Sequence, residues 1–223
     1  MAYIRKILRA AAVGMGLLMF PANSLSAHTE YWEQRVSLFD HLPVNSGDIV
    51  FLGNSITDGG EFAELFGNPA IKNRGINGDV IAGVRERLHQ VTDGKPAKIF
   101  LLIGINDISH NIPASHLAKE YEALVKEIAK ASPATKLYVQ AVMPINNDFG
   151  RYKNLKGKEA TVTELNKLLK TIAADNGATF IDLTDILSGQ DGKLRKEFTN
   201  DGLHLTGPGY LAWTKHIKHF TEE

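Results

Sequence analysis

Five short apolar segments along the chain predict five β-strands, and the longer stretches between them predict helices. The segment 99–103, Ile-Phe-Leu-Leu-Ile, is apolar at every position. Unbroken apolarity of this length is typical of a strand in a parallel sheet that helices cover on both faces. The predicted strands span residues 49–53, 70–73, 98–103, 136–143 and 178–183.

Between the predicted strands, apolar side chains recur at the three- and four-residue spacing of a helix face. These stripes cover residues 32–39, 80–91, 117–128, 162–172 and 213–220. Asp79 is the predicted N-cap of the second stripe, Asn176-Gly177 ends the fourth, and Pro208 suits the first turn of the last. Alternating strands and helices imply right-handed crossovers. The predicted fold is therefore a three-layer α/β/α sandwich around a parallel sheet of about five strands, in a single domain.

The first 27 residues have the layout of a secretory signal peptide. Arg5, Lys6 and Arg9 form a basic start, an apolar run follows at 10–20, and small residues lead to Ala27. A membrane anchor is the alternative, but the apolar run is shorter than the ~20 residues of a spanning helix. We therefore expect cleavage after Ala27, no stable membrane anchor, and export of residues 28–223 to the periplasm or the medium.

The composition excludes several classes of function. The 223 residues include 25 Lys and Arg, 25 Asp and Glu, and no Cys. Balanced charge argues against a nucleic-acid partner, because phosphate binding needs concentrated basic residues. The absence of Cys rules out disulfides, thiol nucleophiles and iron–sulfur clusters, and no His-rich spacing supplies the ligands of a metal site. We expect no metal and no cofactor.

Polar residues follow the first three predicted strands, at the carboxyl ends where sheets of this type bind their ligands. Ser55 follows the first strand, so its hydroxyl would stand at the start of a helix. A glycine-containing segment, 73–79, follows the second strand, and Asn106 follows the third. The Asn106 amide would face the same cleft and donate to an oxygen that becomes negative.

Each of these segments alone has a simpler interpretation. Ser55 or Thr57 could cap a helix, the glycines could form a tight turn, and Asn106 could form an Asx turn that ends the strand. Their order and common position at one sheet edge favour a catalytic site instead.

His204 differs from the other seven histidines, because Asp201 stands three residues ahead of it and Gly202 lies between to bend the chain. This spacing lets the Asp201 carboxylate accept from one imidazole nitrogen while the other faces the cleft. His110, close to Asn106, is a weaker alternative base. A nucleophile, its base, an orienting carboxylate and oxyanion donors would then meet in one place.

The segments around Ser55, Gly78, Asn106 and His204 resemble the signature blocks of the GDSL/SGNH hydrolase family, from about residue 48 to the C-terminus. The resemblance implies a flavodoxin-like fold and a serine esterase or acylhydrolase. It implies that Ser55 is the nucleophile, His204 the general base and Asp201 the third member of a triad. The N–H groups of Ser55 and Gly78 and the amide of Asn106 would form the oxyanion hole.

One position departs from the family pattern. Asn54 precedes the serine where the pattern has Asp, so the charge is lost while hydrogen-bonding capacity is kept. Farther on, Asp-Gly-Leu-His-Leu-Thr followed by Gly-Tyr-x-x-Trp is similar to the branch of platelet-activating-factor acetylhydrolase and carbohydrate acetylesterases. This finer resemblance implies a short-acyl ester, acetyl above all, of a carbohydrate or related small alcohol.

Two alternatives remain open at this point. A lysophospholipase or thioesterase would use the same residues on a longer acyl chain, and a glycan-binding domain could keep the fold without the chemistry. The irregular stretch 144–157 is long enough to be functional, and it is too polar to form an apolar groove for a long chain. Oligomeric state also stays open.

Overall fold

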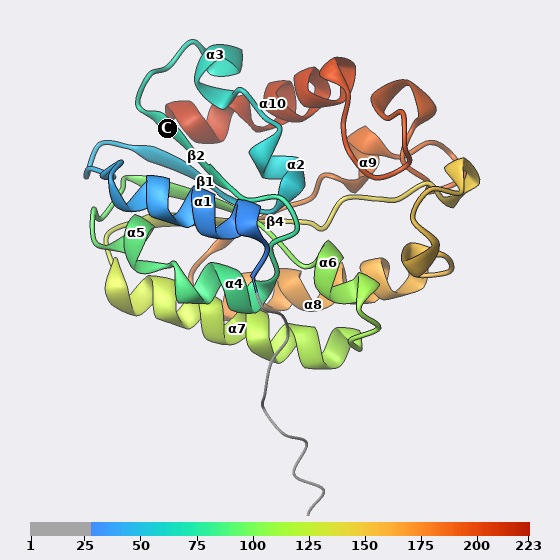
Figure 1. Cartoon of the computed structure of the whole chain (residues 1–223), viewed down its shortest axis with the longest axis horizontal. Helices are drawn as coiled ribbons and strands as arrows, with labels where there is room; N and C mark the ends of the chain where they lie inside the picture. The colour runs from blue at the N-terminus through green and yellow to red at the C-terminus, as the bar shows by residue number, and fades with distance from the viewer. Residues whose placement is uncertain (1–27) are drawn as a thin grey trace, which may run out of the picture.

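The computed structural model describes residues 28–223 and confirms the predicted three-layer fold (Figure 1). One parallel sheet contains β1 (Ile49–Gly53), β2 (Ile71–Gly75), β3 (Lys98–Leu102), β4 (Lys136–Gln140) and β5 (Thr179–Ile181). The strand order β2-β1-β3-β4-β5 is that of flavodoxin-like sheets, whose ligands bind where the order reverses, between β1 and β3. The expected signal peptide lies outside the described residues and stays a prediction.

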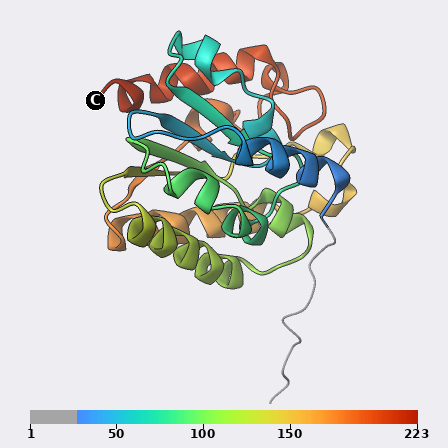
Figure 2. The ribbon, with the colours of Figure 1, turned by 60° about the vertical axis from the view of Figure 1, so that its left-hand side comes forward.

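Helices cover both faces of the sheet, and turning the molecule leaves the two layers clearly separate (Figures 1 and 2). Below the sheet in Figure 1 lie α7 (Ala114–Ala131) and α8 (Glu159–Asp175), which pack against each other. Above it lies α10 (Gly207–Glu222). The shorter helices are α1 (Glu30–Asp40), α2 (Ser55–Asp58), α3 (Phe62–Phe66), α4 (Ile81–Glu86), α5 (His89–Thr92), α6 (Ile105–Ser109) and α9 (Thr184–Leu187). None of the helices within 28–223 is long and apolar enough to cross a membrane.

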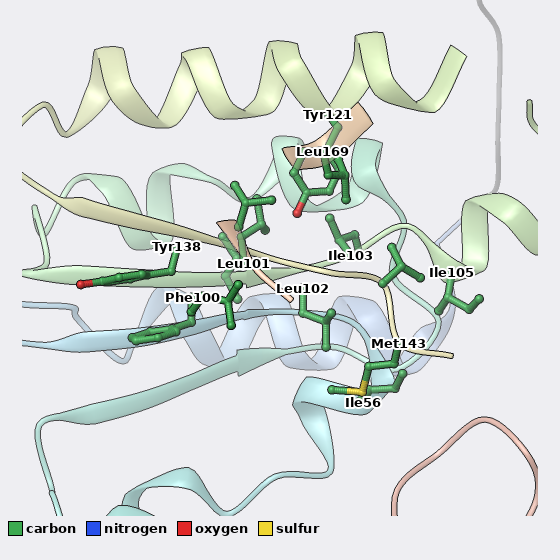
Figure 3. Close-up of a cluster of buried hydrophobic side chains, with 14 of the residues drawn as sticks. Ile56, Phe100, Leu101, Leu102, Ile103, Ile105, Tyr121, Tyr138, Met143 and Leu169 are labelled. Atoms are coloured by element: carbon green, nitrogen blue, oxygen red, sulfur yellow. The ribbon is translucent and has the colours of Figure 1, made fainter. Parts of the chain in front are cut away.

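Both faces of β3 are buried, which accounts for its unbroken apolar sequence. On the α10 side, Phe100 stacks between Phe51 and Tyr138, with ring centroids 4.8 and 4.6 Å away. On the opposite side, Figure 3 shows Tyr121 of α7 and Leu169 of α8 over Ile103. Aromatic rings and branched side chains thus fill the two layers between sheet and helices.

β2 runs on to Gly75 rather than 73, whereas β4 and β5 end earlier than predicted because side chains bind their backbone groups. β4 stops at Gln140 rather than 143, because Asn166 of α8 bonds both the N–H and the carbonyl of Val142, each at 2.8 Å. β5 stops at Ile181 rather than 183, because the carboxylate of Asp182 accepts the N–H of Thr184 at 2.9 Å. Backbone groups satisfied in this way need no neighbouring strand.

The stripe at 80–91 forms two short helices, α4 and α5, rather than one, and Asp79 is not a helix N-cap. Val80 occupies that position. The Asp79 carboxylate instead accepts from Arg87 Nε at 2.8 Å and from Trp32 Nε1 at 3.1 Å. The local prediction was wrong because Trp32, distant in sequence, and Arg87, at the C-terminal end of α4, bind this carboxylate.

Candidate active site

The turn that carries Ser55 follows β1 directly. Ser55 is the first residue of α2, and the N-cap is Asn54, whose Oδ1 accepts the N–H of Ile56 at 3.1 Å. A side chain at Gly53 would collide with the carbonyl oxygen of Leu102, so only glycine fits at the strand end. Because Asn54 caps the helix, Ser55 does not, and its hydroxyl is available for other contacts. The cap needs only an acceptor oxygen, which Asn supplies as Asp would.

The structure brings Ser55, His204 and Asp201 together. His204 Nε2 lies 2.9 Å from Ser55 Oγ, and His204 Nδ1 lies 2.7 Å from Asp201 Oδ2. The His204 side chain is 32% exposed and that of Asp201 14% exposed, so the imidazole meets solvent while the carboxylate is mostly covered. His110 lies exposed at the end of α6, so the place beside Ser55 belongs to His204.

Hydrogen bonds hold Asp201 in its ionised form. Its Oδ1 accepts the N–H groups of Leu203 and His204 at 2.9 and 2.8 Å, and its Oδ2 accepts the Tyr152 hydroxyl at 3.0 Å in addition to His204. Burial alone would raise the pKa of Asp201, but these bonds outweigh it and lower the pKa to about 2. A carboxylate therefore faces His204 Nδ1 throughout the neutral range.

Gly202 bends the chain between Asp201 and His204 as the sequence predicts. Its φ of +87° is in the left-handed region that favours glycine. A side chain here would also collide with the carbonyl oxygen of Asn146. This turn is thus packed directly against the start of the 144–157 loop, as the N–H of Asn146 also donates to the Gly202 carbonyl at 2.8 Å.

The segments of Gly78 and Asn106 reach the same sheet edge as Ser55. Gly53 at the end of β1 pairs in register with Gly75 of β2 and Leu102 of β3. Asn106 Nδ2 donates to the carbonyl of Asp79 at 2.8 Å, which joins the two predicted oxyanion segments. Within residues 28–223 the N–H groups of Ser55 and Gly78 make no hydrogen bond, so both are available to an incoming oxygen.

A buried ion pair supports the Gly78 segment, and the sequence analysis missed it. Arg87 and Asp79 have side chains that are 0% and 1% exposed, 2.8 Å apart. Arg87 also donates to the carbonyls of Gly53 at 3.1 Å and Arg74 at 3.0 Å, next to the nucleophile turn. Burial raises the pKa of Asp79, and the Arg87 guanidinium opposes that rise. No local pattern marks these two residues as partners.

Asp107 binds the chain just after Gly78 and Asp79, where α4 begins. Its carboxylate accepts the N–H of Ile81 at the start of α4, at 3.2 Å. Burial raises the pKa of Asp107 to about 6. Asn106 and Asp107 are neighbours in α6. This helix therefore binds the chain that follows β2 at two points, the carbonyl of Asp79 and the N–H of Ile81.

Tyr152 is a further residue at this site to which the sequence alone assigned no role. It lies between two 3₁₀ turns, Asn147–Phe149 and Lys153–Leu155, in the 144–157 loop. Besides its bond to Asp201, the Tyr152 hydroxyl is 3.1 Å from His204 Nδ1. The only signal in the sequence was the length of this irregular stretch.

Comparison with known proteins bears on this arrangement. The model of the GDSL-like Lipase/Acylhydrolase family matches residues 51–212. This protein belongs to that family. It is a carboxylic ester hydrolase, and the resemblance drawn from the four sequence segments is confirmed.

Relatives from animals and bacteria share the fold. The protein is 30% identical over 177 residues to platelet-activating factor acetylhydrolase IB subunit alpha2 of Rattus norvegicus, covering 75% of this chain and 73% of the relative. A solved structure from Streptococcus pneumonia, provisionally described as a platelet activating factor, is 30% identical with a TM-score of 0.79, over 86% of this chain and 92% of that one. Axe2, an acetylxylan esterase from Geobacillus stearothermophilus, has a TM-score of 0.63 over 81% and 96% of the chains, and at 19% identity it shows the fold alone.

Proposed function

We propose that this family member hydrolyses short-acyl esters, acetyl esters above all, of carbohydrates or related small alcohols. The observation that carries the proposal is the continuous chain of contacts from Ser55 Oγ through His204 to Asp201 Oδ2. The name of a relative supports the acyl group, because the Rattus norvegicus protein is an acetylhydrolase. Export of the mature chain after cleavage at Ala27 is part of the proposal.

In the proposed mechanism, His204 Nε2 takes the proton of Ser55 Oγ as this oxygen attacks the ester carbonyl. Asp201 stabilises the imidazolium that forms. The carbonyl oxygen becomes negative beside the N–H groups of Ser55 and Gly78 and the Asn106 amide. The intermediate collapses to an acyl-enzyme, His204 returns the proton to the departing alcohol, and water then releases the acid by the reverse sequence of proton transfers.

A longer-chain lysophospholipase or thioesterase is the second candidate. The surface of the 144–157 loop favours a polar alcohol group instead, because Asp148, Arg151 and Lys153 are exposed on it. Phe149 is the exposed large apolar side chain of this loop, 37% accessible. A single aromatic ring among charges is better suited to one face of a sugar than to a long acyl chain.

Acetate release decides between these candidates. The mature protein would be assayed against acetylated xylan oligosaccharides, other acetylated polysaccharides and glycerolipids, and against p-nitrophenyl esters of increasing acyl length. We expect the highest kcat/KM on acetyl esters and a loss of at least about 10⁴-fold in kcat for Ser55→Ala. Ser37→Ala is the control, since this serine lies on the exposed helix α1 and bonds only the Gln34 carbonyl.

Three results would contradict the proposal. Equal or better turnover of octanoyl esters would favour the long-chain enzyme. No turnover of any ester together with no acylation of Ser55 would favour a glycan-binding protein. An exported protein whose intact mass still includes the first 27 residues would overturn the predicted cleavage.

A further inference from the structure

The 144–157 loop places the phenol side chain of Tyr152 beside the carboxylate of Asp201. The Tyr152 hydroxyl donates to Asp201 Oδ2 at 3.0 Å, on the same oxygen that binds His204. The Tyr152 ring also stands edge-on to the imidazole of His204, with centroids 5.7 Å apart and planes at 69°. Tyr152, which belongs to another segment of the chain, therefore contacts both Asp201 and His204.

Contacts on both sides fix the loop that carries this phenol. The N–H of Asn146 binds the carbonyl of Gly202 within the catalytic turn, and Asn146 Nδ2 binds the carbonyl of Leu194, both at 2.8 Å. Asn147 Nδ2 donates to Glu159 at the start of α8 at 2.6 Å. The backbone around Tyr152 is thus tied to the turn that contains Asp201 and to the helical layer below the sheet.

With Tyr152 in place, the hydrogen bonds to Asp201 are complete. Two backbone N–H groups and, at 3.3 Å, the Thr199 hydroxyl bind Oδ1, and His204 and Tyr152 bind Oδ2. A carboxylate stabilises an adjacent imidazolium by its negative charge, and a second donor on the same oxygen withdraws part of that charge. Tyr152 thus holds Asp201 in position and also limits how strongly Asp201 favours the protonated form of His204.

We propose that Tyr152 is a positioning residue that fixes Asp201 against His204 and sets the pH below which His204 stops acting as a base. The proposal rests on the proposed function of Ser55 and His204. The titratable and charged groups around the imidazole are Asp201 and Tyr152, with Arg151 beyond the Tyr152 hydroxyl. Asp201 is ionised throughout the relevant range, so the acid limb of the rate profile reports protonation of His204.

Tyr152→Phe tests the proposal because it keeps the ring and removes only the hydroxyl. In the mature protein with p-nitrophenyl acetate, we expect kcat to fall about threefold to tenfold, as for the loss of one hydrogen bond, while KM changes by less than about twofold. Without the second donor, Asp201 stabilises the imidazolium more strongly. The acid limb of kcat/KM therefore moves to higher pH by about half a unit.

Tyr31→Phe is the matched control. Tyr31 also donates its hydroxyl to a carboxylate, Asp58 Oδ2 at 2.7 Å, but within residues 28–223 neither side chain hydrogen-bonds His204. The same atom is lost, so a general effect of removing a phenol would appear in both variants. We expect the Tyr31→Phe acid limb to coincide with that of the wild type.

An unchanged acid limb in Tyr152→Phe would overturn the proposal, whether kcat falls or not, because a purely structural role lowers kcat without changing proton affinity. NMR titration of the His204 ring in both proteins gives the same comparison without turnover. If the wild type proves inert toward esters while the ring titration still differs between the two proteins, the proposed function fails and the positioning role stands.

Discussion

The proposed oxyanion side and the proposed acid–base side of the candidate active site are held by different kinds of structure. On the oxyanion side, the Gly78 segment is fixed by Asp79 and Arg87, whose side chains are almost fully buried. On the acid–base side, His204 is 32% exposed and stands on an irregular turn, supported by Tyr152 from another irregular loop. One side is fixed to the ends of β1 and β2 by a buried ion pair, and the other is assembled from loops.

This difference matches what each side does in ester hydrolysis. Oxyanion donors are effective when they are already aimed at the place where charge develops and need not move. A general base must exchange protons with a leaving alcohol and with water, so it needs contact with solvent. A buried ion pair suits the first task, and a loop-supported imidazole suits the second.

The largest effect is expected from breaking the buried ion pair. Arg87→Met leaves Asp79 as an unpaired buried charge, which typically lowers the free energy of unfolding by about 3–5 kcal/mol. Denaturant unfolding measures the loss. Arg85→Met, two positions earlier, removes a surface pair with Glu120 and Glu127 and should cost about 0–1 kcal/mol.

The double variant Asp79→Asn/Arg87→Met sharpens this test. Removing both charges leaves no unpaired ion, so we expect part of the lost stability to return. If Arg85→Met and Arg87→Met prove equally destabilising, the buried ion pair would not be what distinguishes the Gly78 side of the site.

The next effect is on turnover. Asn106→Ala removes one oxyanion donor, and such a loss typically lowers kcat by ~10²–10³-fold. The variant also loses the bond to the Asp79 carbonyl, which should cost about 1 kcal/mol of stability and leave the protein folded. The exposed Asn45→Ala serves as control in the same assay. Activity within a few-fold of the wild type would remove Asn106 from the oxyanion hole.

The smallest effect is a pH-dependent change in thermal stability. The folded pKa of Asp107, about 6, is above its ordinary value, so the folded protein binds a proton more readily than the unfolded chain. Ionised Asp107 therefore destabilises the fold above pH 6, and this cost disappears as the pH falls from 6 toward 4. Asp107→Asn should raise the melting temperature by a few degrees at pH 8, by about half as much at pH 5, and by little at pH 4. A difference that stays constant with pH would contradict this account.

Local sequence patterns predicted most of the fold and the grouping of Ser55, His204 and Asp201. The apolar segments predicted all five strands, most clearly β1 and β3, because a strand that is buried at every position must be apolar on both faces. Asp201 and His204 could be predicted as partners because they are three residues apart with Gly202 between them. This spacing places both side chains in one turn. Ser55 could be found because it follows a strand that ends at a parallel sheet edge.

The supporting residues could not be found in this way, since their contacts depend on packing. Tyr152 meets Asp201 only because the 144–157 loop is tied to Gly202 through Asn146. Asp79 was predicted as a helix cap from its local context, which carries no information about Trp32 of α1. Contacts between segments that no motif links appear only when the tertiary structure is assembled.

The close approach of Gly202 to Asn146 has a consequence for redesign. The backbone of the 144–157 loop touches the backbone of the catalytic turn with no room for a side chain between them. Replacing this loop to accept a different alcohol would therefore also disturb the geometry that ionises Asp201. We therefore expect substrate range and catalytic rate to be coupled in this scaffold, and a grafted loop should keep the Asn146 backbone contact and a phenol at position 152.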